Sequence, residues 1–319
     1  MVTYNSADDI DVCLTAALEQ KVEGGLEVLV LDNASTDATV DRIKQHGDAT
    51  LVESAANSGY AEGNNELFRR AAGEYVALLN PDCAPDAGCM QTLVDHLESE
   101  RSCAVAAAEL RFPDGRPQAF ARRELTIPGV VWGLTYAGRE IDRRWRHDRG
   151  DRERRYEGLA PGPGGVATVD CPAAACVVLR RSDHGDQLLD PEFPLVFNDG
   201  DLCHRLRAAG KRCDVVFAAT AVHGYGRSLH LIPSPRRRAE FVASLRRYAR
   251  KNASVTTQVA VTAVMYLDIA TALLLALVRR DRRALHHARG TAGGLGLPGG
   301  SPPWLVEPPR WGRRPSRSR

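Results

Sequence analysis

The chain has 319 residues, of which 44% are hydrophobic and 26% charged, as is usual for a globular protein of one large or two modest domains. The formal net charge is +2, but ten arginines and only two acidic residues lie between positions 279 and 319, so the rest of the chain is mildly acidic. This distribution favours contact with an anionic surface over a role in nucleic-acid recognition. The eight cysteines form no Cys-x-x-Cys pair, so the usual zinc spacing is absent. With no recognisable signal peptide, we expect free thiols in a reducing cytoplasm.

The first residues predict the end of a buried strand. Residues 2–4 read Val-Thr-Tyr, and Asn5 and Ser6 favour a turn after them. The apolar residues that should precede this strand are missing, so we expect a truncated first strand, as a misplaced start codon would leave it. A helix that runs through Ile10, Leu14 and Leu18 should follow, with Ser6 or Asp8 as its N-cap.

A second buried strand is predicted at residues 26–31, and it ends in the run Asp32-Asn33-Ala34-Ser35-Thr36-Asp37. One interpretation of this run is a helix start, with Ser35 or Thr36 as the cap. The other is a nucleotide site, in which Asp32 accepts a hydrogen bond from the N–H of a uracil or thymine ring. We favour the second interpretation because ligands bind at the carboxyl ends of strands in open α/β sheets.

The alternation continues with a strand at residues 50–53, a helix at 66–72 and a strand at 75–79. Residues 57–65 read Asn-Ser-Gly-Tyr-Ala-Glu-Gly-Asn-Asn. Their glycines and amides would let a ligand approach the backbone closely, although a plain surface loop uses the same residues. Strands that alternate with helices predict a mostly parallel central sheet with crossover helices on its faces.

The strand at 75–79 ends in Asn80-Pro81-Asp82. Pro81 cannot donate to a β-ladder, so the strand must stop there. Asp82 then lies at the carboxyl end of a buried strand, where its carboxylate can hold a divalent cation that in turn holds a diphosphate. The competing interpretation is a simple turn, since all three residue types favour turns.

The second half of the chain offers two more candidate groups. Asp199 and Asp201 lie at the start of a predicted helix, where acids are favoured by the helix dipole but where a general base could also be placed. His223 follows a predicted strand at 212–218; it is either structural or a metal ligand, and with Asp82 it would suit Mn²⁺ or Mg²⁺. Residues 139–157 are dense in charge with little periodicity, which predicts a mobile, solvated insertion.

The order of these motifs resembles the family 2 glycosyltransferases with a GT-A fold, and most closely their rhamnosyltransferase-like subgroup. The resemblance covers residues 3–228. It is carried by Thr3-Tyr4-Asn5-Ser6, residues 32–37, residues 57–61, Gly63-Asn64-Asn65, Leu79-Asn80-Pro81-Asp82, residues 198–203 and Val222-His223. It implies a Rossmann-like α/β sheet flanked by helices and an inverting transfer of sugar from dTDP-rhamnose or a UDP-sugar to a lipid-linked or polysaccharide acceptor in cell-wall or surface glycan synthesis.

The resemblance also implies roles for individual positions. Asp199 would be the catalytic base, and Asp82 and His223 would bind Mg²⁺ or Mn²⁺, with Asn80-Pro81-Asp82 in the place of the family's Asp-x-Asp motif. Asn198 stands where the family has Glu, a departure that bears on the base and the acceptor. The nucleotide sugar would be bound by Thr3, Tyr4, Asn5, Asp32, Asn33, Ser35, Asp37, Asn57, Gly59, Asn64, Asn80 and Asp82.

The C-terminal part differs in character from the rest. Residues 255–278 are mostly apolar and long enough to span a bilayer, but Asp268 lies inside them and would be costly in lipid. An interfacial or re-entrant helix, a soluble packing helix and a true span all remain open, and the basic flanks favour attachment to anionic lipids. From residue 290 onward, Gly, Pro, Ser and Arg predict disorder.

These observations predict three segments: a GT-A domain at 1–230, a membrane-associated helical segment at 231–285 and a disordered basic tail at 286–319. The enzyme would be cytoplasmic and peripheral to the inner face of the cell membrane, with a sugar nucleotide and a lipid-linked sugar or glycan as partners and no nucleic acid. Two alternatives stay open. One is a catalytically impaired nucleotide-sugar-binding protein; the other is a sugar-nucleotide nucleotidyltransferase, which would want a glycine-rich loop with a basic residue after the first strand.

Overall fold

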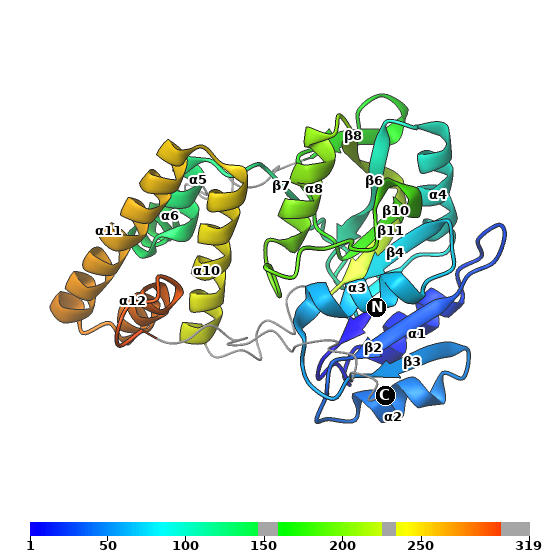
Figure 1. The fold of residues 1–319 in the computed structure, drawn as a ribbon, viewed down its shortest axis with the longest axis horizontal. Helices are drawn as coiled ribbons and strands as arrows, with labels where there is room; N and C mark the ends of the chain where they lie inside the picture. Colours follow the sequence, from blue (N-terminus) through cyan, green and yellow to red (C-terminus); the bar gives the residue numbers. More distant parts are fainter. Residues whose placement is uncertain (146–158, 225–233, 301–319) are drawn as a thin grey trace, which may run out of the picture.

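The computed structural model describes residues 1–145, 159–224 and 234–300. An α/β part and a bundle of helices lie side by side in it (Figure 1). The two parts meet where α10 (Ser234–Asn252) of the bundle packs against α8 (Asn198–Ala208) of the α/β part.

The first sheet is parallel, as predicted, and has the order β1-β2-β3. Its strands are β1 (Val2–Thr3), β2 (Val28–Asp32) and β3 (Ala49–Glu53). The first strand is as short as the sequence predicts, and it pairs only with the last two residues of β2, Leu31 and Asp32. Beyond this short strand, a cavity of about 460 Å³ lies between β2 and β4, with Leu29 and Leu78 among its lining residues.

The second sheet is mixed, which corrects the expectation of a mostly parallel sheet for this half. Its order is β4-β10-β6-β11-β5, and β8 pairs with β11. Among the described pairings of this sheet only β6–β11 is parallel, and the other four are antiparallel pairs between strands far apart in sequence. The strands are β4 (Tyr75–Leu79), β5 (Cys83–Pro85), β6 (Cys103–Arg111), β8 (Val166–Val169), β10 (Cys176–Arg180) and β11 (Arg212–His223). A small ribbon pairs β7 (Ala121–Arg122) with β9 (Cys171–Pro172).

Helices cover both sheets, and three of their starts differ from the prediction. The helices that cover the sheets are α1 (Ile10–Leu18), α2 (Thr39–Gln45), α3 (Gly59–Arg70) and α4 (Cys89–Ser99). The N-caps of α1 and α2 are Asp9 and Ala38, and neither uses a side-chain cap bond. The predicted caps serve elsewhere: Ser35, for instance, bonds to Asp32. Helix α3 begins at Gly59 and not at residue 66, because Pro194 O accepts the backbone N–H groups of the first turn.

The bundle corrects two further expectations. It comprises α5 (Ile127–Leu134), α6 (Tyr136–Trp145), α10, α11 (Val255–Arg279) and α12 (Arg282–Gly294). Residues 139–145 of the predicted solvated insertion are helical in α6, and residues 286–294 of the predicted disordered tail are helical in α12. Residues 295–300 are described and lie just after α12, whereas residues 146–157 and 301–319 lie outside the described residues.

The core of the α/β part is one large apolar cluster that includes the small residues of β6, Ala104 and Ala106–Ala108. All eight cysteines are buried and free, as expected of thiols that act as small hydrophobes. The described residues contain one helix, α11, that is long and apolar enough to cross a membrane by length and composition.

Candidate active site

Asp82 and His223 are brought together by a β-ladder. Strand β5 starts immediately after Asp82, and Cys83 is the register partner of His223 on β11. The backbone oxygen of Asp82 accepts from Gly224 N at 2.8 Å. As a result, Asp82 Oδ1 lies 3.3 Å from His223 Nε2, and only 8% and 7% of the two side chains are exposed. Two residues 141 positions apart in sequence therefore share one small polar site.

Gln118 fixes the protonation of this imidazole. Its Nε2 donates to the backbone oxygen of His223 at 2.6 Å, so its Oε1 is the atom that faces His223 Nδ1 at 3.1 Å. Nδ1 must then carry a proton, and Nε2 turns either a lone pair or a second proton toward Asp82. In the first case two acceptors face each other, an arrangement that a bound cation satisfies. A neutral imidazole nitrogen with a carboxylate oxygen is a donor set that fits Mn²⁺ or Mg²⁺.

Asp199 is presented at the start of α8. Phe197, two residues before Asp199, has a left-handed backbone with φ 70°. This conformation turns the chain sharply into the helix. Asn198 Oδ1 accepts from Asp199 N at 2.8 Å, and Asp199 Oδ1 accepts from Gly200 N at 2.9 Å. Its Oδ2 accepts from Arg122 Nη1 at 2.8 Å. The carboxylate is held in one orientation with little exposure.

Tyr60 carries a phenol whose pKa both carboxylates influence. This residue lies in the first turn of α3, and its hydroxyl donates to Ala174 O at 3.1 Å. Burial raises the pKa of the Tyr60 phenol, and the negative charges of Asp199 and Asp82 raise it further. Both carboxylates are therefore close enough to act on the same phenol. Asp82 and His223 are thus in direct contact, and Asp199 acts on the same phenol as Asp82.

The loops after β1 and β2 form a second polar group beside this region. The Asp32 carboxylate accepts from Thr3 Oγ1 at 3.1 Å and from the Ser35 hydroxyl and N–H at 2.5 and 2.9 Å. Ser35 Oγ in turn accepts from Asn5 N at 2.9 Å. Asp37 accepts from Thr39 N at 3.0 Å. Asp32 thus orders the loop itself, and with about four lone-pair sites on a carboxylate it retains room for one further donor.

The amide side chains of Asn33 and of the run at residues 57–65 are engaged inside the protein. Asn33 accepts from Ser58 N at 2.8 Å and donates to Gly59 O at 3.0 Å. Asn64 donates to the backbone oxygen four residues earlier at 2.8 Å. Asn57 accepts from Gly59 N at 2.9 Å. These side chains shape the start of α3.

Exposure separates the predicted nucleotide-binding residues into two groups. Thr3, Asp32, Asn33, Gly59 and Asn64 are buried, whereas Tyr4, Asn5, Ser35, Asp37, Asn57, Asn80 and Asp82 are partly or fully exposed. The side chains of the second group are accessible to a ligand, apart from the Asp82 carboxylate, of which only 8% is exposed.

Three residues near the site escaped the sequence analysis as functional candidates. Gln118 and Arg122 belong to no recognisable motif, and only the β-pairing brings them to His223 and Asp199. Asn65 was recognised only as part of the glycine-rich run. It accepts from Leu188 N and Leu189 N at 3.1 and 2.8 Å, so it clamps the segment that leads into α8.

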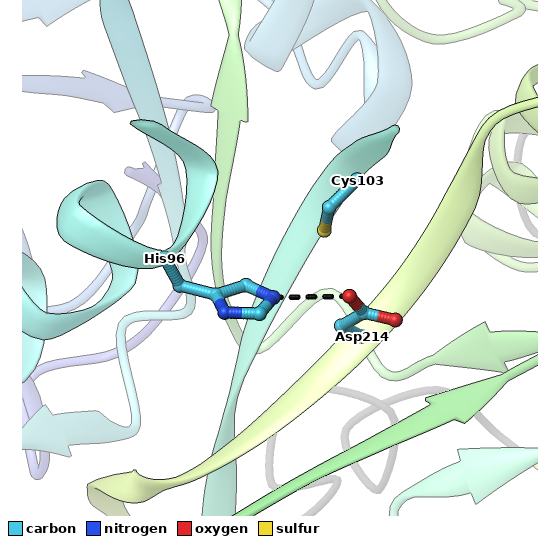
Figure 2. A group of neighbouring side chains, drawn as sticks. All are labelled: His96, Cys103 and Asp214. Atoms are coloured by element: carbon cyan, nitrogen blue, oxygen red, sulfur yellow. Dashed lines mark hydrogen bonds and ion pairs between the residues drawn. The ribbon is translucent and has the colours of Figure 1, made fainter. Parts of the chain in front are cut away.

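A third cluster lies at the opposite end of β11. Figure 2 shows His96 pointing to Asp214, with the Cys103 thiol beside them, and the three offer atoms within 4.8 Å of one another. Asp214 also accepts from Thr168 and Arg212 at 2.7 and 2.9 Å. Although burial opposes it, these bonds lower the pKa of the Asp214 carboxyl. Because Arg212 already balances the charge, we interpret this cluster as structural.

The sequence matches the family model "Glycosyl transferase family 2" over residues 1–164. It is 26% identical over 235 residues to the "N-acetylglucosaminyl-diphospho-decaprenol L-rhamnosyltransferase" of Mycobacterium tuberculosis (strain ATCC 25618 / H37Rv), covering 70% of this chain and 74% of that protein. It is 33% identical over 123 residues to the "Putative teichuronic acid biosynthesis glycosyltransferase TuaG" of Bacillus subtilis (strain 168), covering 36% of this chain and 47% of that protein.

Solved structures with a similar fold include the mannosyltransferase PcManGT from Pyrobaculum calidifontis in complex with GDP-Man and Mn²⁺. The TM-score is 0.52 at 18% identity, over 92% of this chain and 84% of that one. GalNAc-T7 with UDP, GalNAc and Mn²⁺ also gives a TM-score of 0.52, at 13% identity, over 70% of this chain and 42% of that one. This chain thus spans less than half of GalNAc-T7, and the likeness concerns the fold, which is the predicted GT-A type. The family match covers residues 1–164 of 319, so the chain belongs to glycosyl transferase family 2 and is a glycosyltransferase.

Proposed function

We propose that the chain is an inverting transferase that moves a sugar from dTDP-rhamnose or a UDP-sugar to a lipid-linked sugar or growing glycan in cell-wall or surface polysaccharide synthesis. The observation that supports this proposal is the contact between Asp82 and His223, together with an Asp199 carboxylate held in one orientation by Arg122 and Gly200 N. The printed names of the curated relatives, a rhamnosyltransferase with a decaprenol-linked substrate and a teichuronic acid glycosyltransferase, support the substrate classes.

Asp82 and His223 would hold a divalent cation, Mg²⁺ or Mn²⁺. When bound, the cation neutralises negative charge on the leaving nucleoside diphosphate. Gln118 keeps Nε2 of His223 turned toward Asp82, the part that the hydrogen-bonded partner of a ligating histidine plays in metal sites.

Asp199 would take the proton from the acceptor hydroxyl as it attacks the anomeric carbon. General-base assistance of this kind is worth about 10²–10⁴-fold in rate. Arg122 and Gly200 N hold the carboxylate in place. Departure of the diphosphate on the opposite side of the sugar then gives inversion.

The donor nucleotide would contact the partly exposed group of residues: Tyr4, Asn5, Ser35, Asp37, Asn57, Asn80 and Asp82. Asp32 would contribute its remaining lone-pair site to the base. Thr3, Asn33, Gly59 and Asn64 would act indirectly, because they build the loops that carry the others. The enzyme would work at the cytoplasmic face of the cell membrane, where a lipid-linked acceptor is accessible.

One observation favours a second candidate, a nucleotide-sugar-binding protein with impaired catalysis. Asn198 replaces the Glu expected from the resemblance, and its amide oxygen is engaged by Asp199 N. A neutral amide at this position cannot supply a second carboxylate to the acceptor.

An assay of the purified chain with Mn²⁺ and a panel of UDP-, dTDP- and GDP-sugars separates the two. Release of nucleoside diphosphate from one donor, stimulated by a polyprenyl-diphosphate sugar acceptor, is the expected result. Binding of a donor without hydrolysis or transfer across the panel would establish the binding protein instead.

A further inference from the structure

Helix α11 presents an apolar face to the outside of the molecule. Its exposed large apolar residues are Val255, Val259, Tyr266, Leu267, Leu273, Leu274, Leu277 and Val278, with exposed fractions from 41% at Leu273 to 79% at Leu277. Between residues 255 and 278 no exposed position carries a charge. The outward face of a helix on a water-soluble surface is normally polar, and an apolar stripe of this length marks an interaction site.

The one charged residue of this stretch points inward. Asp268 is buried and accepts from Tyr136 N at 2.6 Å, from Arg238 at 3.1 Å and from His287 Nε2 at 2.6 Å. These partners belong to α6, α10 and α12, so one face of α11 is covered by three other helices. Lipid therefore cannot surround α11 as it surrounds a spanning helix, and only the outward face is available to a partner.

Basic residues lie at both ends of the apolar face. Arg250 precedes α11, Arg279 is its last residue, and Arg280, Arg282 and Arg283 follow it; all five are exposed. An apolar stripe bounded by exposed arginines complements a leaflet in which acyl chains lie beneath anionic headgroups. Another protein surface would need acidic residues at both ends of a long apolar groove to match the same pattern.

We propose that the outward face of α11 inserts in the plane of an anionic lipid leaflet, with the arginines at its two ends against the headgroups. Helix α10 lies between α11 and the α/β part (Figure 1), and Lys251 on α10 bonds to Asp201 in the first turn of α8 at 2.8 Å. The docked bundle would thus hold Asp199 at a set height above the membrane. This proposal deepens the proposed function. It depends on that function only in taking the acceptor to be lipid-linked.

The test measures binding of the full chain to vesicles, without any sugar nucleotide. Phosphatidylcholine vesicles with and without phosphatidylglycerol are floated with the wild type, with Leu274→Glu/Leu277→Glu and with Val12→Glu, a control at an exposed apolar residue of α1. We expect binding that requires phosphatidylglycerol, a loss of about tenfold or more in the double variant and no change in the control. Arg282→Gln/Arg283→Gln should bind more weakly and with less dependence on salt.

The proposal would be overturned if the wild type and the double variant bound equally well, or if the wild type bound equally to both kinds of vesicle. It would also be overturned if neither protein bound lipid and the wild type, but not the double variant, formed dimers in the absence of vesicles. Circular dichroism of each variant confirms folding. Donor hydrolysis in buffer without vesicles reports on the proposed function separately, so a failure of either proposal can be told from a failure of the other.

Discussion

At the scale of single residues, Asp199 and Asp201 are two acids in the same first turn of α8 with different surroundings. Asp199 faces Arg122 from the small β7–β9 ribbon. Asp201 is fully buried and is held by Lys251, Arg205 and Asn252. The first lies beside the proposed acceptor position, and the second joins α8 to α10.

We therefore predict that Asp199→Asn lowers kcat by about 10²–10⁴-fold with little change in donor affinity, measured by nucleoside-diphosphate release. The matched change Asp201→Asn should lower the melting temperature, because it leaves Lys251 and Arg205 with one charge fewer to pair with. Its kcat per folded molecule should stay near the wild-type value. Equal turnover in Asp199→Asn and wild type would contradict the assignment of the base.

Gln118 provides a second prediction. Gln118→Leu removes the acceptor of His223 Nδ1–H and the donor to His223 O. Loss of such a partner usually costs about 10–100-fold in metal affinity, so Mn²⁺-dependent nucleotide binding should weaken by that factor. The opposite outcome, unchanged Mn²⁺ affinity in a folded variant, would show that the imidazole needs no support.

The sequence could locate Asp82, Asp199 and His223 because each follows or begins a predictable element. It could not reveal Gln118, Arg122 or Tyr60, because their roles depend on which strands pair. Gln118, for example, reaches His223 across 105 positions of sequence. Nor could it show that Asn33 and Asn64 are used inside the loop, since an amide that binds a ligand and one that binds the backbone look the same in sequence.

At the scale of elements, α12 shows why composition misled the sequence analysis. Gly290 and Gly294 contributed to the prediction of disorder, yet both lie in a helix packed tightly against α10. A Cβ at Gly290 would lie 2.6 Å from Arg238 Cβ and from Pro235 O, and one at Gly294 would lie 2.5 Å from Val242 Cβ. These glycines permit the two helices to approach closely, a use that composition alone does not distinguish from flexibility.

The consequence can be tested by Gly290→Val. The added methyl groups collide with the backbone of α10, which cannot move aside as a flexible side chain would, so we expect a loss of roughly 1–3 kcal/mol in unfolding free energy. The control is Arg289→Val, which places the same side chain at an exposed position of the same helix. A Gly290→Val protein as stable in urea as Arg289→Val would contradict the packing described here.

The polar network around Asp268 makes the bundle sensitive to pH. Arg139 Nη2 donates to His287 Nδ1 at 2.9 Å, so Nδ1 carries no proton. The ring proton is then on Nε2, which donates to Asp268. Burial lowers the pKa of His287 from 6.5 to about 4. The folded protein thus keeps a neutral imidazole where the unfolded chain takes up a proton.

Between pH 6.5 and pH 4 the unfolded state binds more protons, so stability should fall as the pH falls through this window. The difference between the two pKa values corresponds to about 3 kcal/mol at most. Urea unfolding across this range, compared between wild type, His287→Gln and the exposed neighbour His286→Gln, measures it. The slope should flatten only in His287→Gln; a parallel slope in both variants would place the pH dependence elsewhere.

Element prediction succeeded for β2, β3 and β4 because their apolar runs are bounded by turn residues. It missed the direction of β10 and the existence of β5, because strand direction in a mixed sheet is set by long-range pairing and not by local pattern. It also placed the start of α3 too late, because Pro194 O, a distant acceptor, completes its first turn.

At the scale of the whole molecule, the bundle and the catalytic part are joined through aromatic and charged contacts. Phe197, whose left-handed backbone precedes Asp199, packs against Phe241 and Tyr248 of α10 with ring centroids 5.2 and 5.5 Å apart. The start of α8 is therefore positioned by the same helix that supports α11. These contacts are the connection through which the proposed membrane docking of the bundle would position the proposed base, Asp199.

The central claim is that Asp82 and His223 hold the cation through which the donor diphosphate is bound. Calorimetric titration of UDP and dTDP into wild type and Asp82→Asn, each with Mn²⁺ and with EDTA, tests it most directly. We predict that the wild type binds one of the two nucleotides, and only in the presence of Mn²⁺. For Asp82→Asn we predict that the affinity for each nucleotide is the same with Mn²⁺ as with EDTA. Nucleotide binding that is equally tight with Mn²⁺ and EDTA in the wild type, or equally Mn²⁺-dependent in Asp82→Asn, would contradict it.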